Sequence, residues 1–166
     1  MEHVTPAPPT SLPEQPELAH IADAFEHHFP TTLKALLLFG SRARGTQCAE
    51  SDYDIYAIID NLPTEPIARL KLVRMALFDI EDRVNVIART PREVEKDLSP
   101  LLMEVCVDGK TLFGAQYFEP MRQRGLEAIS QSGMIRERVG SEWFWHFPGI
   151  QKKPWELTWS GYRELR

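Results

Sequence analysis

The chain is poor in cysteine, in excess positive charge and in long apolar runs, and each shortage argues against a class of protein. Its 166 residues include only two cysteines, Cys48 and Cys106, which lie far apart and match no metal-site spacing. The formal net charge is −5, whereas a nucleic-acid-binding protein needs clustered Lys and Arg to neutralise phosphates. No apolar stretch approaches the length of a membrane span, and the N-terminus lacks the basic start and apolar segment of a signal peptide. We therefore expect a reduced, cytoplasmic setting, with neither membrane nor nucleic acid as the main partner.

What is present fits one domain with a flanking segment on each side. Hydrophobic residues make up 43% of the chain, enough for a globular core. Residues 1–16 contain five of the 13 prolines and predict a disordered arm, and residues 17–130 predict the folded domain. Residues 131–166 form an aromatic-rich tail that holds all four tryptophans. We expect this tail to dock on a partner, with packing against the domain's own sheet as the alternative.

Apolar spacing and turn residues predict alternating helices and strands, which indicates an α/β or α+β domain with a small sheet. The helix expected after residue 63 has Thr64 as its cap and a core face of Ile67, Leu70, Val73, Leu77 and Ile80. Thr90 and Glu93 form a capping box at the start of a later helix. The other elements predicted are helices at 17–29, 101–107 and 117–129 and strands at 33–39, 52–59, 83–88 and 111–113.

The turn after the first strand is the first half of a candidate site. Gly40 gives the backbone freedom to turn sharply and lets a ligand approach closely. Ser41 adds a hydroxyl donor at the start of a short helix, whose free amides favour phosphate. Arg42 and Arg44 carry guanidinium groups that suit phosphate oxygens. The alternative is an ordinary turn with solvated arginines, or with Arg44 tying the loop to a carboxylate.

The second half of the candidate site is Asp52-x-Asp54 at the start of the second strand. Residues two apart on a strand project from the same face, so the two carboxylates would lie side by side. Adjacent carboxylates repel unless a cation lies between them, and Mg²⁺ or Mn²⁺ accepts such oxygen ligands together with triphosphate oxygens. The alternative is a pair of aspartates that cap a turn at the strand edge. We expect ATP or another nucleoside triphosphate as substrate, with an acceptor hydroxyl attacking the α-phosphorus.

Gly40-Ser41, ten intervening residues and Asp52-x-Asp54 resemble the signature of the DNA polymerase β-type nucleotidyltransferase superfamily, and in particular its minimal branch. The segments 83–87 and 108–113 resemble its third strand and its closing turn, so the resemblance covers roughly residues 17–130. It implies a small, mixed, twisted sheet with helices packed on one side and Mg²⁺-dependent transfer of a nucleotide. Some minimal members are antitoxins that transfer AMP to a tyrosine of a partner HEPN-type ribonuclease, and others are aminoglycoside-type transferases.

One position departs from the family pattern. The third strand of the family carries a catalytic carboxylate, and Asn85 stands at that position here. The carbonyl of an asparagine can ligate a metal, but it carries no charge and cannot act as a general base. The nearby acids Glu81 and Asp82 precede the strand, and Asp82 has the opposite parity to Asn85.

Three hypotheses follow. The first is an antitoxin-type enzyme that transfers a nucleoside monophosphate to a partner protein, with Asp52, Asp54 and Asn85 as catalytic residues. The second is a catalytically degenerate transferase that acts by binding its partner. The third is a small-molecule transferase of the aminoglycoside type.

Overall fold

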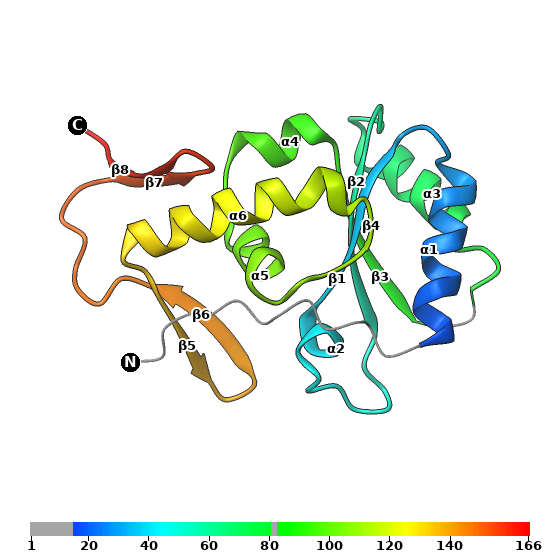
Figure 1. The fold of residues 1–166 in the computed structure, drawn as a ribbon, viewed down its shortest axis with the longest axis horizontal. Helices are drawn as coiled ribbons and strands as arrows, with labels where there is room; N and C mark the ends of the chain where they lie inside the picture. The colour runs from blue at the N-terminus through cyan, green and yellow to red at the C-terminus, as the bar shows by residue number, and fades with distance from the viewer. Residues whose placement is uncertain (1–14, 81–82) are drawn as a thin grey trace.

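The fold is built on one four-stranded sheet (Figure 1). The computed structural model describes residues 15–80 and 83–166. The strand order is β3-β2-β1-β4, with β2 and β3 parallel and β1 antiparallel to both β2 and β4. This mixed sheet confirms the predicted α+β class, whereas the predicted proline-rich arm lies, but for its last two residues, outside the described residues. The strands are β1 (Leu33–Phe39), β2 (Tyr53–Ile59), β3 (Val84–Arg89) and β4 (Lys110–Phe113).

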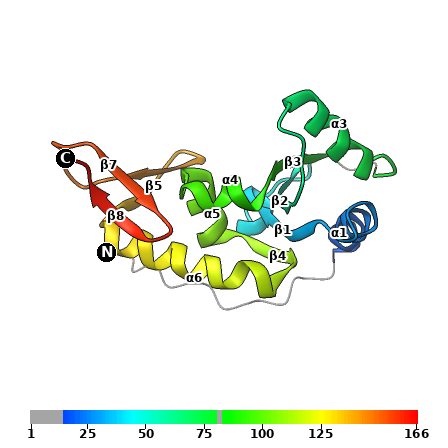
Figure 2. The same ribbon diagram turned by 90° about the horizontal axis from the view of Figure 1, so that it is seen from above.

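Six helices in the described part of the chain cover both faces of the sheet rather than one (Figure 2). On β1, Leu36 and Leu38 pack with α1 and α3, while Ala35 and Leu37 pack with α4, α5 and α6. The implied one-sided arrangement is therefore wrong in this detail. The physical reason is visible in β1, whose nearly continuous apolar run needs cover on both sides. The helices are α1 (Pro16–His28), α2 (Gly40–Arg44), α3 (Pro66–Ala76), α4 (Pro91–Lys96), α5 (Pro100–Asp108) and α6 (Ala115–Ser132).

The cap of α4 is the one predicted from the sequence, whereas the cap of α3 is a different residue. The capping box of Thr90 and Glu93 is formed as predicted. At α3 the cap is Glu65 rather than Thr64, because the Glu65 carboxylate accepts from the amides of the first turn. Only the second half of α3 is buried, so Ile67 and Leu70 are exposed instead of facing the core.

The tail folds into two β-hairpins where the sequence showed no clear periodicity. The first pairs β5 (Ile135–Val139) with β6 (Glu142–His146), and the second pairs β7 (Trp155–Thr158) with β8 (Gly161–Glu164). Gly140 takes the left-handed first position of a two-residue loop, a signal for a hairpin that periodicity alone does not reveal. No helix among residues 15–80 and 83–166 combines the length and apolarity that a bilayer span requires.

Candidate active site

Strand register brings the two halves of the candidate site together. Phe39, the last residue of β1, pairs with Asp54 of β2 in the antiparallel ladder. Asp54 in turn pairs with Asn85 in the parallel ladder between β2 and β3. The turn at Gly40 therefore begins one residue beyond the partner of Asp54, and Asn85 lies on the opposite side of the same carboxylate.

Asp52 and Asp54 project from the same face, as the two-residue period of a strand predicts. The Asn85 amide nitrogen donates to Asp52 Oδ2 at 3.0 Å and to Asp54 Oδ1 at 3.3 Å. One neutral side chain thus bridges two carboxylates that would otherwise repel each other. The charge of the pair is not neutralised by this contact, so the amide orients the acids without removing their attraction for a cation.

Gly40 lies against Asp54 so closely that no other residue fits without displacement. Its φ is +74°, and a Cβ built on it would lie 2.3 Å from Asp54 Oδ2. The short helix α2 then closes on the Ser41 carbonyl, which accepts from the amides of Gly45 and Thr46. The Gly-Ser turn and the Asp-x-Asp pair are therefore in direct contact, as their spacing in the sequence predicts.

The two arginines of α2 make intramolecular contacts that favour the alternative role considered for Arg44. Arg42 donates twice to the Ser51 carbonyl, at 3.0 and 2.7 Å, and its guanidinium lies 4.0 Å from the centre of the Tyr53 ring. Arg44 approaches Glu104 and Asp108 of α5 at 3.8 and 3.6 Å. Arg42 therefore ties α2 to the loop before β2, and Arg44 ties it to α5. Their contact with phosphate remains a prediction.

The acids suit a hard divalent cation better than a soft one. Asp52 Oδ1 is shielded from solvent and forms an ion pair with Arg83, whose Nε lies 2.9 Å away. Two neighbouring carboxylates are fitting ligands for Mg²⁺ or Mn²⁺. Among the described residues no three His, Cys, Asp or Glu side chains gather as a metal cage, so substrate oxygens and water would complete the shell. Glu81 and Asp82, the other acids considered, lie outside the described residues.

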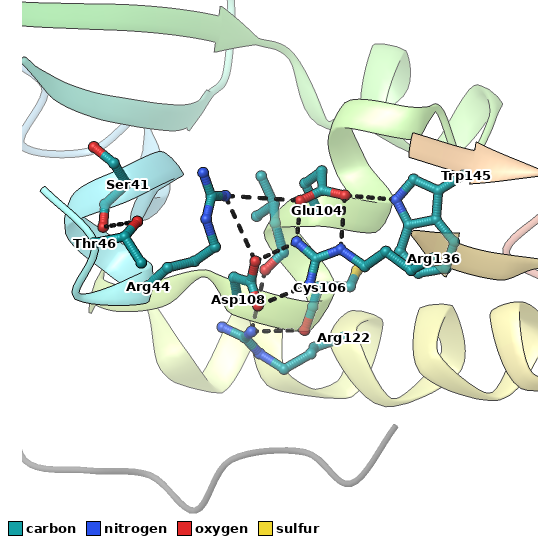
Figure 3. Close-up of polar contacts among 10 residues, drawn as sticks. Ser41, Arg44, Thr46, Glu104, Cys106, Asp108, Arg122, Arg136 and Trp145 are labelled. Atoms are coloured by element: carbon teal, nitrogen blue, oxygen red, sulfur yellow. Dashed lines mark hydrogen bonds and ion pairs between the residues drawn. The ribbon is translucent and has the colours of Figure 1, made fainter. Parts of the chain in front are cut away.

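Sequence reasoning missed Arg83, and missed the part that the tail plays near the site. Arg83 immediately precedes β3, and its position beside Asp52 follows from the parallel register. Glu104, Asp108 and Arg136 form a polar cluster around Arg44, which joins α2, α5 and β5 (Figure 3). The i, i+4 spacing of the two acids on α5 was a visible signal, but their partner in the tail was not.

The site lies within a region similar to known nucleotidyltransferases. Residues 19–116 match the family model described as "Polymerase beta, Nucleotidyltransferase". A protein from Methanocaldococcus jannaschii, "Putative protein adenylyltransferase MJ1305", is 31% identical over 110 residues, which cover 61% of this chain and 75% of that protein.

Chains in solved structures are similar to this one. A crystal structure of a toxin–antitoxin with AMP-PNP contains a chain that is 25% identical, with a TM-score of 0.50 and coverage of 68% of this chain and 84% of that chain. A structure of a tri-AMPylated Shewanella oneidensis HEPN toxin with an MNT antitoxin contains a chain that is 23% identical, with a TM-score of 0.47. The match covers 70% of this chain and 83% of that chain.

Proposed function

Because the chain belongs to the polymerase beta nucleotidyltransferase family, we propose that it transfers AMP from ATP to a hydroxyl group of a partner protein, as an antitoxin acting on its toxin. The observation that carries the proposal is the contact between Gly40 and Asp54. The glycine lets the turn lie directly against Asp54, so backbone groups that could contact a triphosphate stand beside carboxylates that can hold the accompanying cation. Either feature alone is common, and their contact within a family of transferases is what supports this chemistry.

Each residue of the site has a distinct role in the proposal. Asp52 and Asp54 would hold Mg²⁺ or Mn²⁺, and a bound cation would neutralise charge on the α-phosphoryl group and on the leaving pyrophosphate. The turn at Gly40 and Ser41 would contact the phosphates through its backbone and the Ser41 hydroxyl. Asn85 would keep the two carboxylates parallel through its amide. Arg42 and Arg44 would act indirectly, by holding α2 in place.

In the proposed reaction the oxygen of the acceptor hydroxyl forms a bond to the α-phosphorus of ATP. The bond between that phosphorus and the oxygen bridging to the β-phosphate breaks, and pyrophosphate leaves with the electron pair. The hydroxyl proton needs a base. Asn85 cannot accept it, so among these three side chains the carboxylates of Asp52 and Asp54 are the available bases.

The proposed partner is a small HEPN-type toxin. A relative named as a protein adenylyltransferase supports a protein acceptor, and a similar chain in a toxin–antitoxin structure with AMP-PNP supports both the partner class and the adenine nucleotide. The cytoplasmic setting expected from the two unpaired cysteines agrees with such a partner.

The direct test is intact-protein mass spectrometry of a candidate toxin after incubation with this chain, ATP and MgCl₂. We expect the toxin to gain the mass of one or more AMP groups. Asp52→Asn and Asp54→Asn should each abolish the gain while the variants keep the far-UV circular dichroism of the parent, because removing one of two like charges does not unfold the domain. A wild-type chain that modifies no toxin encoded beside it would reject the proposal.

A second candidate, a binding module without catalysis, is favoured by one observation. Asn85 replaces the third carboxylate and donates to both remaining acids, an arrangement that is stable without any metal. Such a module would neutralise its toxin by contact alone. Toxin activity assayed with and without ATP separates the candidates, because only the transferase needs the nucleotide.

A further inference from the structure

A compact polar cluster joins the short helix of the site to the first hairpin, β5–β6 (Figure 3). It contains Arg44 at the end of α2, Glu104 and Asp108 on α5, and Arg136 on β5. The two acids are four residues apart and project from the same face of α5. Arg136 belongs to the hairpin, beyond the residues 19–116 that match the family.

Arg136 contacts the two carboxylates at shorter distances than Arg44 does. Its Nε donates to Glu104 and its Nη1 to Asp108, both at 3.1 Å, and its Nη2 contacts both carboxylates. Arg44 approaches the same two carboxylates only to 3.8 and 3.6 Å. A guanidinium that forks across two acids fixes their orientation, whereas the longer contacts of Arg44 depend on where those acids point.

The hairpin also restrains Arg136 and Glu104 directly. The Trp145 indole N–H donates to Glu104 at 2.6 Å, and the Trp143 ring lies 4.3 Å from the Arg136 guanidinium. The exposed fraction of the Arg136 side chain is 10%, and those of the acids are 17% and 18%. Charges this shielded from water attract each other more strongly than exposed ones.

The charges of the cluster balance only when both arginines are present. Two neighbouring carboxylates face two guanidinium groups, so loss of Arg136 would leave both acids to Arg44 alone. Burial disfavours the charged form of Arg136, yet its hydrogen bonds to Asp108 and Glu104 more than offset this and raise its pKa. The acids would then reorient towards water, and the longer Arg44 contacts would be lost.

Helix α2 is held by its side chains: Arg42 donates to the Ser51 carbonyl, Ala43 is buried in the core, and Arg44 contacts the cluster. It has five residues, too few for a stable isolated helix, and its first turn has no side-chain cap. Its first residue, Gly40, lies against Asp54, and its last, Arg44, lies against the cluster. A shift at Arg44 is therefore transmitted over one helical turn to the residue that contacts the catalytic acid.

We propose that Arg136 is a positioning residue, through which the first hairpin holds α2 and so sets the Gly40 turn against Asp54. For its effect on nucleotide binding, the inference rests on the function proposed above. The first hairpin would then contribute to nucleotide binding through its effect on α2.

The test combines amide hydrogen exchange of the free protein with binding of AMP-PNP in MgCl₂. Arg136→Gln should speed exchange at Gly45 and Thr46, whose amides bond to the Ser41 carbonyl, and should raise the Kd for AMP-PNP about fivefold. Arg138→Gln is the matched control and should change neither quantity, because Arg138 lies on the same strand but is exposed and donates to the Gly140 carbonyl of its own turn. Arg136→Lys, which keeps the charge without the fork, should give intermediate values and serves if the glutamine variant does not fold.

Coupling to Arg44 distinguishes positioning from general loosening. Arg44→Gln should reproduce both effects, and the double variant should be no worse than either single variant because both act through the same contact. Additive effects, or unchanged exchange at Gly45 and Thr46 in Arg136→Gln, would overturn the proposal. If Arg136→Gln speeds exchange at Gly45 and Thr46 but the wild-type protein does not bind AMP-PNP, the positioning role of Arg136 is supported and the proposed function is rejected.

Discussion

Asp54 Oδ2 occupies the space in which a Cβ on Gly40 would lie, 2.3 Å from its ideal position. We predict that Gly40→Ala displaces Asp54 and weakens binding of Mg²⁺ with AMP-PNP at least about tenfold, because the new methyl group and the carboxylate cannot share that space. Isothermal titration calorimetry on the purified variant measures the effect.

Gly45→Ala is the matched control for this prediction. Gly45 has the same φ of +74°, but a Cβ there would meet nothing within 4 Å. The two variants therefore share the backbone strain and differ in the contact with Asp54. Equal losses of affinity in both would mean that strain in α2, rather than displacement of the acid, explains the result.

Replacing Asn85 by Asp should convert a metal-independent arrangement into a metal-dependent one. Without metal, Asn85→Asp removes the two amide donations and places a third negative charge beside Asp52 and Asp54, so we expect the free energy of unfolding to fall by about 1–3 kcal/mol. MgCl₂ should restore this stability, and transfer of AMP should rise about tenfold or more once a third carboxylate is available.

Urea unfolding with MgCl₂ and with EDTA measures the first effect, and the initial rate of toxin modification measures the second. The wild-type chain, with its amide bridge, should respond less to EDTA than Asn85→Asp does. If the free energy of unfolding of Asn85→Asp does not change with Mg²⁺, the side chains at positions 52, 54 and 85 do not share one cation. A variant that gains transfer from an inactive parent would identify the natural chain as the degenerate binding module.

The central part of the fold could be predicted because its signals are local. The span of β1 is the one predicted, and the capping box of Thr90 and Glu93 is formed where the spacing predicts it. The contact between Gly40 and Asp54 also followed from the sequence, since ten intervening residues allow the chain to leave β1 and return antiparallel beside it.

The rest depends on contacts between segments far apart in the chain. Arg136 finds its acids across 28 and 32 residues, and no periodicity in the tail points to α5. The exposure of Ile67 and Leu70 has a similar origin, because burial of α3 is decided by which half of it meets α1 and β3. The one-sided packing of helices came from the family resemblance, although the apolar run of β1 already required cover on both faces.

The two cysteines should react at very different rates with an alkylating reagent near pH 8. Cys48 is exposed, and the Ser51 hydroxyl, 3.3 Å from its sulfur, lowers the pKa of the thiol and favours the reactive thiolate. Burial raises the pKa of Cys106 to about 12, so its thiol is both protonated and shielded. Mass spectrometry should find one adduct in native protein, on Cys48, and two in urea. Rapid labelling of native Cys106 would mean that the packing between α5 and α6 is not as described.

Trp159 of the second hairpin is buried against the folded domain. Trp159 is 5% exposed, and its indole N–H donates to the Val94 carbonyl of α4 at 2.7 Å. Gly125 of α6 makes room for the ring, since a Cβ there would lie 3.0 Å from Trp159 and 2.8 Å from the Cys106 sulfur. The second hairpin is thus seated on helices of the domain, not on its sheet, and Trp159 should contribute to global stability.

We expect Trp159→Ala to lower the free energy of unfolding by about 3–5 kcal/mol, the usual cost of removing a buried aromatic side chain. Trp155→Ala, from the same hairpin, is the control, because Trp155 is 38% exposed and its ring contacts Phe147 edge-on and Tyr162 at a tilt; its cost should be about 1 kcal/mol. Urea denaturation followed by far-UV circular dichroism measures both. A single unfolding transition with unequal losses of stability would show that the second hairpin unfolds together with the domain. Equal small losses, or a separate early transition for the tail, would show that the hairpins do not unfold cooperatively with the domain.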